Sequence, residues 1–190
     1  MINHKGKKID YIEHGEGPAI LFIPGSFSTP SAWSAVQKLM PSNYRFISTS
    51  LCGYGSTEEL RSTDNYGMHN LIDIIETVVA KIGQPVHLVG HSFGGMVALA
   101  CALSDRFEIL SITTFEANPI TLIDACRHRH LFEETMKIKD EFEAAFNAQN
   151  KDAAKIIIDF WGGDGSFASM PDPVQQYCRQ TAYNNVLDWH

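Results

Sequence analysis

Over the first 118 residues, short apolar runs alternate with amphipathic stretches. The runs are bounded by Gly, Pro or Ser, and residues 19–25 are continuously apolar, as expected of a strand buried on both faces of a sheet. Further strands are predicted at residues 44–50, 85–90 and 109–115, with short pieces at residues 9–14. Between them, helices are predicted at residues 31–40, 66–82 and 93–103. This alternation predicts an α/β fold in which a mostly parallel sheet has helices on both faces.

The pattern changes after Pro119. Residues 121–190 read as helices interrupted by "GGDGS" and "MPDP", without an apolar strand. We therefore expect a sheet-containing part over residues 1–118 and a helical subdomain over residues 119–190. One side of its long helix is expected to pack against the core, with a place in a pocket lining as the alternative. The residues on that side are Leu131, Met136, Phe142 and Phe146.

Composition narrows the class of protein. Apolar residues make up 44% of the chain and charged residues 19%, which predicts a packed globular protein. The formal charge of -7 argues against a nucleic-acid-binding face, which would be basic. No signal peptide and no apolar stretch of membrane-spanning length is visible, so a cytoplasmic protein with no membrane partner is expected. The cysteines are far apart, without a C-x-x-C pair, which favours reduced thiols over disulfides or zinc. They are Cys52, Cys101, Cys126 and Cys178.

The stretch "HLVGHSFGGMVALA", residues 87–100, contains the strongest chemical signal. Gly90, Ser92 and Gly94 form the pattern G-x-S-x-G where a strand ends and a helix begins. So sharp a turn strains the backbone of the serine, and glycines on both sides let the neighbouring backbones approach. Ser92 would then be an exposed nucleophile above a helix N-terminus, which favours negative charge. The alternative is a glycine-rich turn that only packs a helix closely on a strand.

Two further stretches of the sequence resemble loops of a known family. "FIPGSFSTPSAW" resembles the oxyanion loop of the α/β-hydrolase superfamily, with Gly25 and Trp33 matching and Pro24 in place of the usual His. "STSLCGYGST" is similar to the Asp-x-Arg-Gly-x-Gly-x-Ser loop of that family, from which Ser50 and Cys52 depart. "GHSFGG" looks like its nucleophile elbow, and residues 119–190 resemble its helical cap.

The resemblance implies a serine hydrolase. The backbone N–H groups of Ser26 and Phe93 would form the oxyanion hole, and such donors contribute about 3–4 kcal/mol each. Glu116, which follows "ILSITTF", stands where some members have the catalytic acid; holding the cap hinge or capping a helix is its alternative role. Dehalogenases and epoxide hydrolases of this superfamily need a carboxylate nucleophile. Ser92 therefore favours acyl transfer on an ester, a lactone or a carbon–carbon bond next to a carbonyl.

The resemblance also places the catalytic base beyond residue 190. Family members have a His after the eighth strand, whereas His190 ends a stretch that reads as a helix, and the other histidines have structural explanations. We therefore expect a chain that lacks the last strands of the core and is inactive by itself. The strand at residues 109–115 would be an exposed edge, which predicts a homodimer or strand exchange.

A pocket for a small carbonyl substrate is expected around Phe27, Phe115 and Trp161, since most ligand pockets are apolar with few polar groups. The glycines of "GGDGS" lack the preceding strand and the Lys of a phosphate-binding loop, so no cofactor and no metal is expected. The alternative function is that of a hydrolase-like binding or receptor protein whose pocket senses a small molecule without chemistry.

Overall fold

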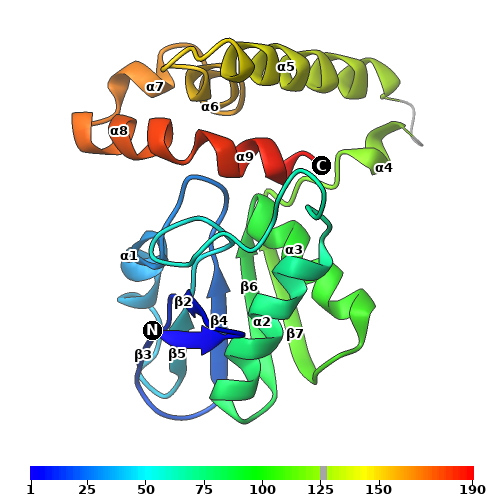
Figure 1. The fold of residues 1–190 in the computed structure, drawn as a ribbon. Coiled ribbons are helices and arrows are strands. Elements are labelled where there is room, and N and C mark those ends of the chain that lie inside the picture. Colours follow the sequence, from blue (N-terminus) through cyan, green and yellow to red (C-terminus); the bar gives the residue numbers. More distant parts are fainter. Residues whose placement is uncertain (125–127) are drawn as a thin grey trace. The chain divides into compact units, whose positions relative to one another are not determined.

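The computed structural model describes residues 1–124 and 128–190 (Figure 1). The chain divides into two compact units, Met1–Asn118 together with His190, and Pro119–Trp189. Of the four cysteines, Cys126 lies outside the described residues. The other three are buried and are not joined in disulfides among the described residues: Cys52, Cys101 and Cys178.

A five-stranded sheet forms the centre of the first unit, in the order β3-β5-β4-β6-β7. β3 is antiparallel to β5, and the other neighbours are parallel. β1 and β2 form a separate antiparallel pair. The strands are β1 (Ile2–His4), β2 (Lys7–Ile9), β3 (Ile12–His14), β4 (Ala19–Ile23), β5 (Arg45–Ser48), β6 (Val86–His91) and β7 (Ile109–Phe115). The predicted α/β class with a mostly parallel sheet is confirmed.

Helices connect the parallel strands. They are η1 (Pro30–Trp33), α1 (Ser34–Gln37), α2 (His69–Ile82) and α3 (Phe93–Ser104). α2 ends where its periodicity predicts, because Gly83 adopts the left-handed conformation at φ 74° and its N–H bonds to the Val79 carbonyl at 3.0 Å. Every residue of β4 is buried, so both faces of the sheet are covered at its centre. On one face lies a cluster formed by Ile20, Phe22, Trp33 and Phe46.

Two predicted elements differ in detail. The predicted helix at residues 31–40 is a 3-10 turn followed by a single α-helical turn that ends at Gln37. Pro41 accounts for the early end, because a residue before proline is disfavoured in the helical conformation. At the N-terminus, Lys5 and Gly6 both have positive φ, and they close a tight hairpin between β1 and β2. β3 then joins the main sheet by itself.

The second unit is helical throughout its described residues. Its helices are α4 (Thr121–Asp124), α5 (Arg129–Asn147), α6 (Ala154–Gly162), α7 (Ser166–Ser169), α8 (Asp172–Gln180) and α9 (Ala182–Asp188). In α5, Phe142 is fully buried and Phe146 stacks on Tyr183 of α9. Leu131, however, is 42% exposed, so the predicted buried side does not reach the first turn. The role of this unit as a cap stays a prediction.

No helix in the described part of the chain is both long enough and apolar enough to cross a membrane.

Candidate active site

Ser92 is the single residue between the end of β6 and the start of α3. Its φ of 51° and ψ of -125° lie in a region that side chains other than glycine rarely adopt. Its N–H donates to the Phe115 carbonyl of β7 at 2.9 Å, and its carbonyl accepts from Gly95 N at 2.9 Å and Met96 N at 3.2 Å. The strand ladder and the first helical turn therefore both hold this residue in the sharp reversal that the sequence predicts. Its side chain is half-buried.

The glycines around Ser92 are there because backbones meet at the turn. A Cβ on Gly90 would lie 2.5 Å from the Gly94 carbonyl oxygen, and one on Gly94 would lie 2.3 Å from the Pro24 carbonyl oxygen. Both distances are far inside van der Waals contact with main-chain atoms that cannot rotate away. Glycine at these positions brings the elbow against the loop that follows β4.

That loop contains the first predicted oxyanion donor. A Cβ on Gly25 would lie 3.0 Å from the Ser92 Cβ, so the backbone beside Ser26 passes next to the serine. The second predicted donor, Phe93, opens α3, and the N–H groups of a first helical turn have no carbonyl partner within the helix. The positive end of the helix dipole lies at the same place. The arrangement suits an anion beside Ser92, and the roles of Ser26 and Phe93 stay predictions.

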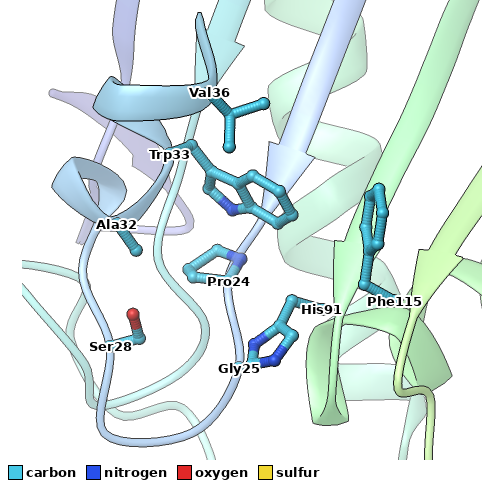
Figure 2. Close-up of a pocket in the computed structure, with 8 residues that line it drawn as sticks. All are labelled: Pro24, Gly25, Ser28, Ala32, Trp33, Val36, His91 and Phe115. Atoms are coloured by element: carbon cyan, nitrogen blue, oxygen red, sulfur yellow. The ribbon is translucent and has the colours of Figure 1, made fainter.

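A pocket of about 400 Å³ opens beside this turn (Figure 2). The rings of Trp33 and Phe115 form two of its walls, with centroids 6.2 Å apart. The full lining consists of Pro24, Gly25, Ser28, Ala32, Trp33, Val36, His91 and Phe115. Of these lining residues, Phe115 is the one that the sequence predicted as a pocket residue. Trp33 was recognised as part of the loop pattern, but its buried ring is brought to the pocket by the turn η1, which the local sequence does not reveal.

The other two predicted pocket residues lie elsewhere. The ring of Phe27 packs edge-on against Tyr54, with centroids 6.1 Å apart, and Phe27 is not among the residues that line this pocket. Trp161 belongs to α6 of the second unit, where it is half exposed and stacks on Trp189. A contact of Trp161 with substrate stays a prediction.

Glu116 directly follows β7 and has a left-handed backbone with φ 52°. Its Oε2 lies 3.4 Å from Nε2 of His91, and both side chains are exposed. Sequence reasoning assigned His91 no role, whereas the structure places its ring in the pocket wall. The hydroxyl of Ser92 has no hydrogen-bond partner in residues 1–124 and 128–190, so neither side chain acts on it directly.

The loop after β5 shows how the two departures from the family pattern are accommodated. Ser50 Oγ donates to Oδ2 of Asp10 at 2.8 Å. The buried guanidinium of Arg61 pairs with Glu59 and donates to the Cys52 carbonyl at 3.3 Å. A carboxylate and a guanidinium are thus present at this loop, but they come from other positions in the sequence.

Cys101 and Cys178 do not compete with Ser92 as nucleophiles. Burial raises the pKa of the Cys101 thiol to about 12 and also raises the pKa of Cys178. A thiol with so high a pKa is protonated and unreactive at neutral pH. No group of three or more metal-ligating side chains is found in the described residues.

Comparisons with known proteins identify relatives of this chain. The model of the alpha/beta hydrolase family matches residues 20–189. The pimeloyl-[acyl-carrier protein] methyl ester esterase of Aeromonas salmonicida is 29% identical over 105 residues, which cover 55% of this chain and 40% of that protein. A fluoroacetate dehalogenase from a Burkholderia species is 28% identical over 115 residues, covering 58% of this chain and 38% of that protein.

Solved structures share the fold. An alpha/beta hydrolase from Sphaerobacter thermophilus aligns with a TM-score of 0.72 at 17% identity, covering 96% of this chain and 70% of that chain. The sequence relatives above are longer than this chain, which spans about 40% of their length.

Proposed function

Because the chain belongs to the alpha/beta hydrolase family, we propose that it carries the nucleophile of a serine hydrolase that acts through an acyl-enzyme. The proposed substrates are esters, lactones or compounds with a carbon–carbon bond next to a carbonyl. The observation that carries the proposal is the backbone of Ser92. A serine held at φ 51° between a strand and a helix, with a glycine loop against its Cβ, matches what an exposed nucleophile requires.

In the proposed reaction, Ser92 Oγ attacks the carbonyl carbon of the substrate. Negative charge moves to the carbonyl oxygen, where the N–H groups of Ser26 and Phe93 stabilise it. The proton of Ser92 passes to a base and then to the leaving group, whose bond to the carbonyl carbon breaks. Water next attacks the acyl ester on Ser92 and releases the acid.

The proposed base is a histidine outside residues 1–190, oriented by Glu116. The position of Glu116 supports this, because it follows β7 and lies beside the elbow. The share of the relatives' length that the chain spans leaves room for such a residue. Loss of the base from a serine triad costs about 10⁶-fold in rate, so residues 1–190 by themselves should turn over very little substrate.

The pocket supports a small, largely apolar substrate. Trp33, Val36 and Phe115 give it apolar walls, and His91 is its titratable group. The names of the relatives refer to different reactions, an ester hydrolysis and a dehalogenation. They therefore do not decide which of the two reactions this chain supports. The serine supports acyl transfer, since its oxygen would form an ester with the acyl group once the leaving group departs, and water can cleave that ester.

Covalent labelling tests the proposal. The protein expressed from its complete reading frame should react with a fluorophosphonate probe at Ser92, located by peptide mass spectrometry, and Ser92→Ala should abolish the label. Ser104→Ala is the matched control, because Ser104 ends the same helix and its hydroxyl donates to the Cys101 carbonyl at 2.7 Å. Labelling of the Ser92→Ala protein to the wild-type extent would overturn the proposal.

The unpartnered hydroxyl of Ser92 also suits a second candidate, a binding protein that senses a small molecule without chemistry. That candidate predicts no covalent label on the complete protein. It also predicts that any small molecule that raises the melting temperature does so equally in wild type and Ser92→Ala. Labelling at Ser92 excludes it.

A further inference from the structure

Asp10 is a buried carboxylate at which several hydrogen bonds meet. It lies between β2 and β3 and is 8% exposed. Its Oδ2 accepts from Ser50 Oγ at 2.8 Å and from the backbone N–H of Ser56 at 2.7 Å. Its own N–H donates to Thr57 Oγ1 at 3.0 Å, and its carbonyl accepts from Thr49 Oγ1 at 2.8 Å. The carboxylate, with its two donors, and the backbone of Asp10, with two further bonds, together hold the segment that supplies these partners.

That segment is the loop of residues 49–57, which turns around the Asp10 carboxylate. Thr57 N bonds to the Tyr54 carbonyl at 3.0 Å and closes a four-residue turn. At its second position, Gly55 has φ 58°, and a Cβ there would lie 2.3 Å from Asp10 Oδ2. The turn can therefore approach the carboxylate only with glycine at residue 55. Asp10 and Gly55 together set the position of Tyr54.

Tyr54 connects the loop to the loop that follows β4. It is fully buried, and its ring packs edge-on against Phe27 with centroids 6.1 Å apart. Phe27 has φ 56°, which is unusual for a bulky side chain and costs about 1–3 kcal/mol unless the surroundings hold it. Packing against a rigid, buried ring can hold it. Phe27 directly follows Ser26, so the placement of Phe27 constrains the path of the loop that carries the Ser26 N–H.

We propose that Asp10 is a positioning residue for the oxyanion loop, acting through the turn at Tyr54 and the ring of Phe27. This inference rests on the proposed serine hydrolase function. Asp10 does not touch the reacting atoms. Its carboxylate holds the loop of residues 49–57, that loop holds Phe27 in its strained conformation, and Phe27 directs the Ser26 N–H toward the developing oxyanion. The family pattern has its carboxylate at position 50, whereas this chain has a serine there and a carboxylate at position 10. The loop therefore keeps one carboxylate to hold it.

An exchange of the two side chains tests the inference in the complete protein, with p-nitrophenyl butyrate as the probe substrate. Asp10→Ser should lower kcat by about ten- to a hundredfold with little change in KM, because an oxyanion donor acts in the transition state. Ser50→Asp alone places two carboxylates together and should be at least as damaging. The double variant restores one carboxylate and one hydroxyl, and it should recover most of the lost kcat.

Glu58→Ser is the matched control, since Glu58 directly follows the loop of residues 49–57 and its carboxylate accepts the Lys8 N–H at 2.7 Å. It should leave kcat and KM unchanged. If Asp10→Ser does not fold, Ser50→Ala removes one bond to the carboxylate and should lower kcat by about threefold at constant KM.

The outcomes separate the inference from the function on which it rests. If the wild-type protein shows no turnover that depends on Ser92, the proposed function is wrong. Turnover in wild type, with variants whose melting temperature falls while kcat per folded molecule stays constant, overturns the positioning role. A double variant as slow as the single variants also overturns it.

Discussion

At the scale of single residues, the candidate site is made by backbones that approach each other closely. Ser92 is strained, and the glycines at 90 and 94 remove the atoms that would keep its neighbours apart. The strain is held by hydrogen bonds to β7 and by the first turn of α3. Specific side chains matter less here than the absence of a Cβ at two positions.

We expect Gly94→Ala to damage the site and the fold together. Its methyl would lie 2.3 Å from the Pro24 carbonyl oxygen and 2.5 Å from that of Ile23, so either β4 or α3 must move. Overpacking of this kind costs about 1–3 kcal/mol, and it should also displace the loop at Gly25 from Ser92. Urea unfolding and fluorophosphonate labelling measure the two effects.

Gly67→Ala is the control for that prediction, because its methyl would meet only the exposed ring of His69, which can rotate away. It should change neither stability nor labelling. A Gly94→Ala protein with wild-type stability and labelling would show that the elbow is not tightly packed.

The elbow could be predicted from the sequence because its demands are local. Gly90, Ser92 and Gly94 stand within five residues, and their steric reason is contained in the turn that they form. The support at Asp10 could not be predicted, since Ser50 is 40 residues away in sequence and no spacing rule connects the two. The pocket walls could not be predicted from the sequence either, because Trp33 and Phe115 meet only after the sheet brings η1 and β7 together.

At the scale of elements, the ends of the sheet differ in how they are secured. β3 has only three residues, and its side-chain bond to Arg45 of β5 connects it to the rest of the sheet. Arg45 of β5 donates to Glu13 of β3 and, at 2.8 Å, to the Ile82 carbonyl at the end of α2. The bonds from Arg45 and then from Tyr11 lower the pKa of the Glu13 carboxyl. The pair is partly exposed, so its contribution is that of a surface ion pair, about 0.2–1 kcal/mol.

Glu13→Gln should therefore lower the free energy of unfolding by less than about 1 kcal/mol at pH 7. A carboxyl whose pKa is lowered by folding stabilises the folded state fully above its unfolded pKa of about 4.3, and this stabilisation is lost as the pH falls through the folded pKa. The difference between wild type and variant should thus shrink as the pH is lowered below the unfolded pKa, as measured by urea unfolding. Glu16→Gln, a change at an exposed residue just beyond β3 that leaves the bond between Arg45 and Glu13 in place, is the control.

Helices and strands were predicted best where a single pattern of apolar residues dominates the sequence. The strand of residues 109–115 and the end of α2 at Gly83 match the structure, since apolarity and a glycine stop act locally. The stretch at residues 31–40 was predicted less well, because helical spacing there competes with Pro41 and with burial of Trp33. The pairing of β3 with β5 depends on residues 30 or more positions apart, which periodicity cannot show.

At the scale of the whole molecule, β7 is the open end of the described sheet. It has seven residues, and no other described strand pairs with its outer side. Leu110 and Phe115 are each about half exposed on it. A long, flat, apolar edge without charges is the kind that pairs with another chain, whereas β3 at the opposite end is short and carries charge.

We expect residues 1–190, expressed alone, to self-associate through β7. The weight-average sedimentation coefficient should rise with protein concentration, and Leu110→Lys should reduce that rise, because a symmetric edge contact would bring two lysines together. Leu39→Lys is the control, since Leu39 is 89% exposed outside the sheet and the substitution changes the net charge equally. An equal effect of both substitutions would assign the association to net charge rather than to β7. A monomer at every concentration would show that the edge is protected in solution, and the sheet would then need no partner strand to be stable.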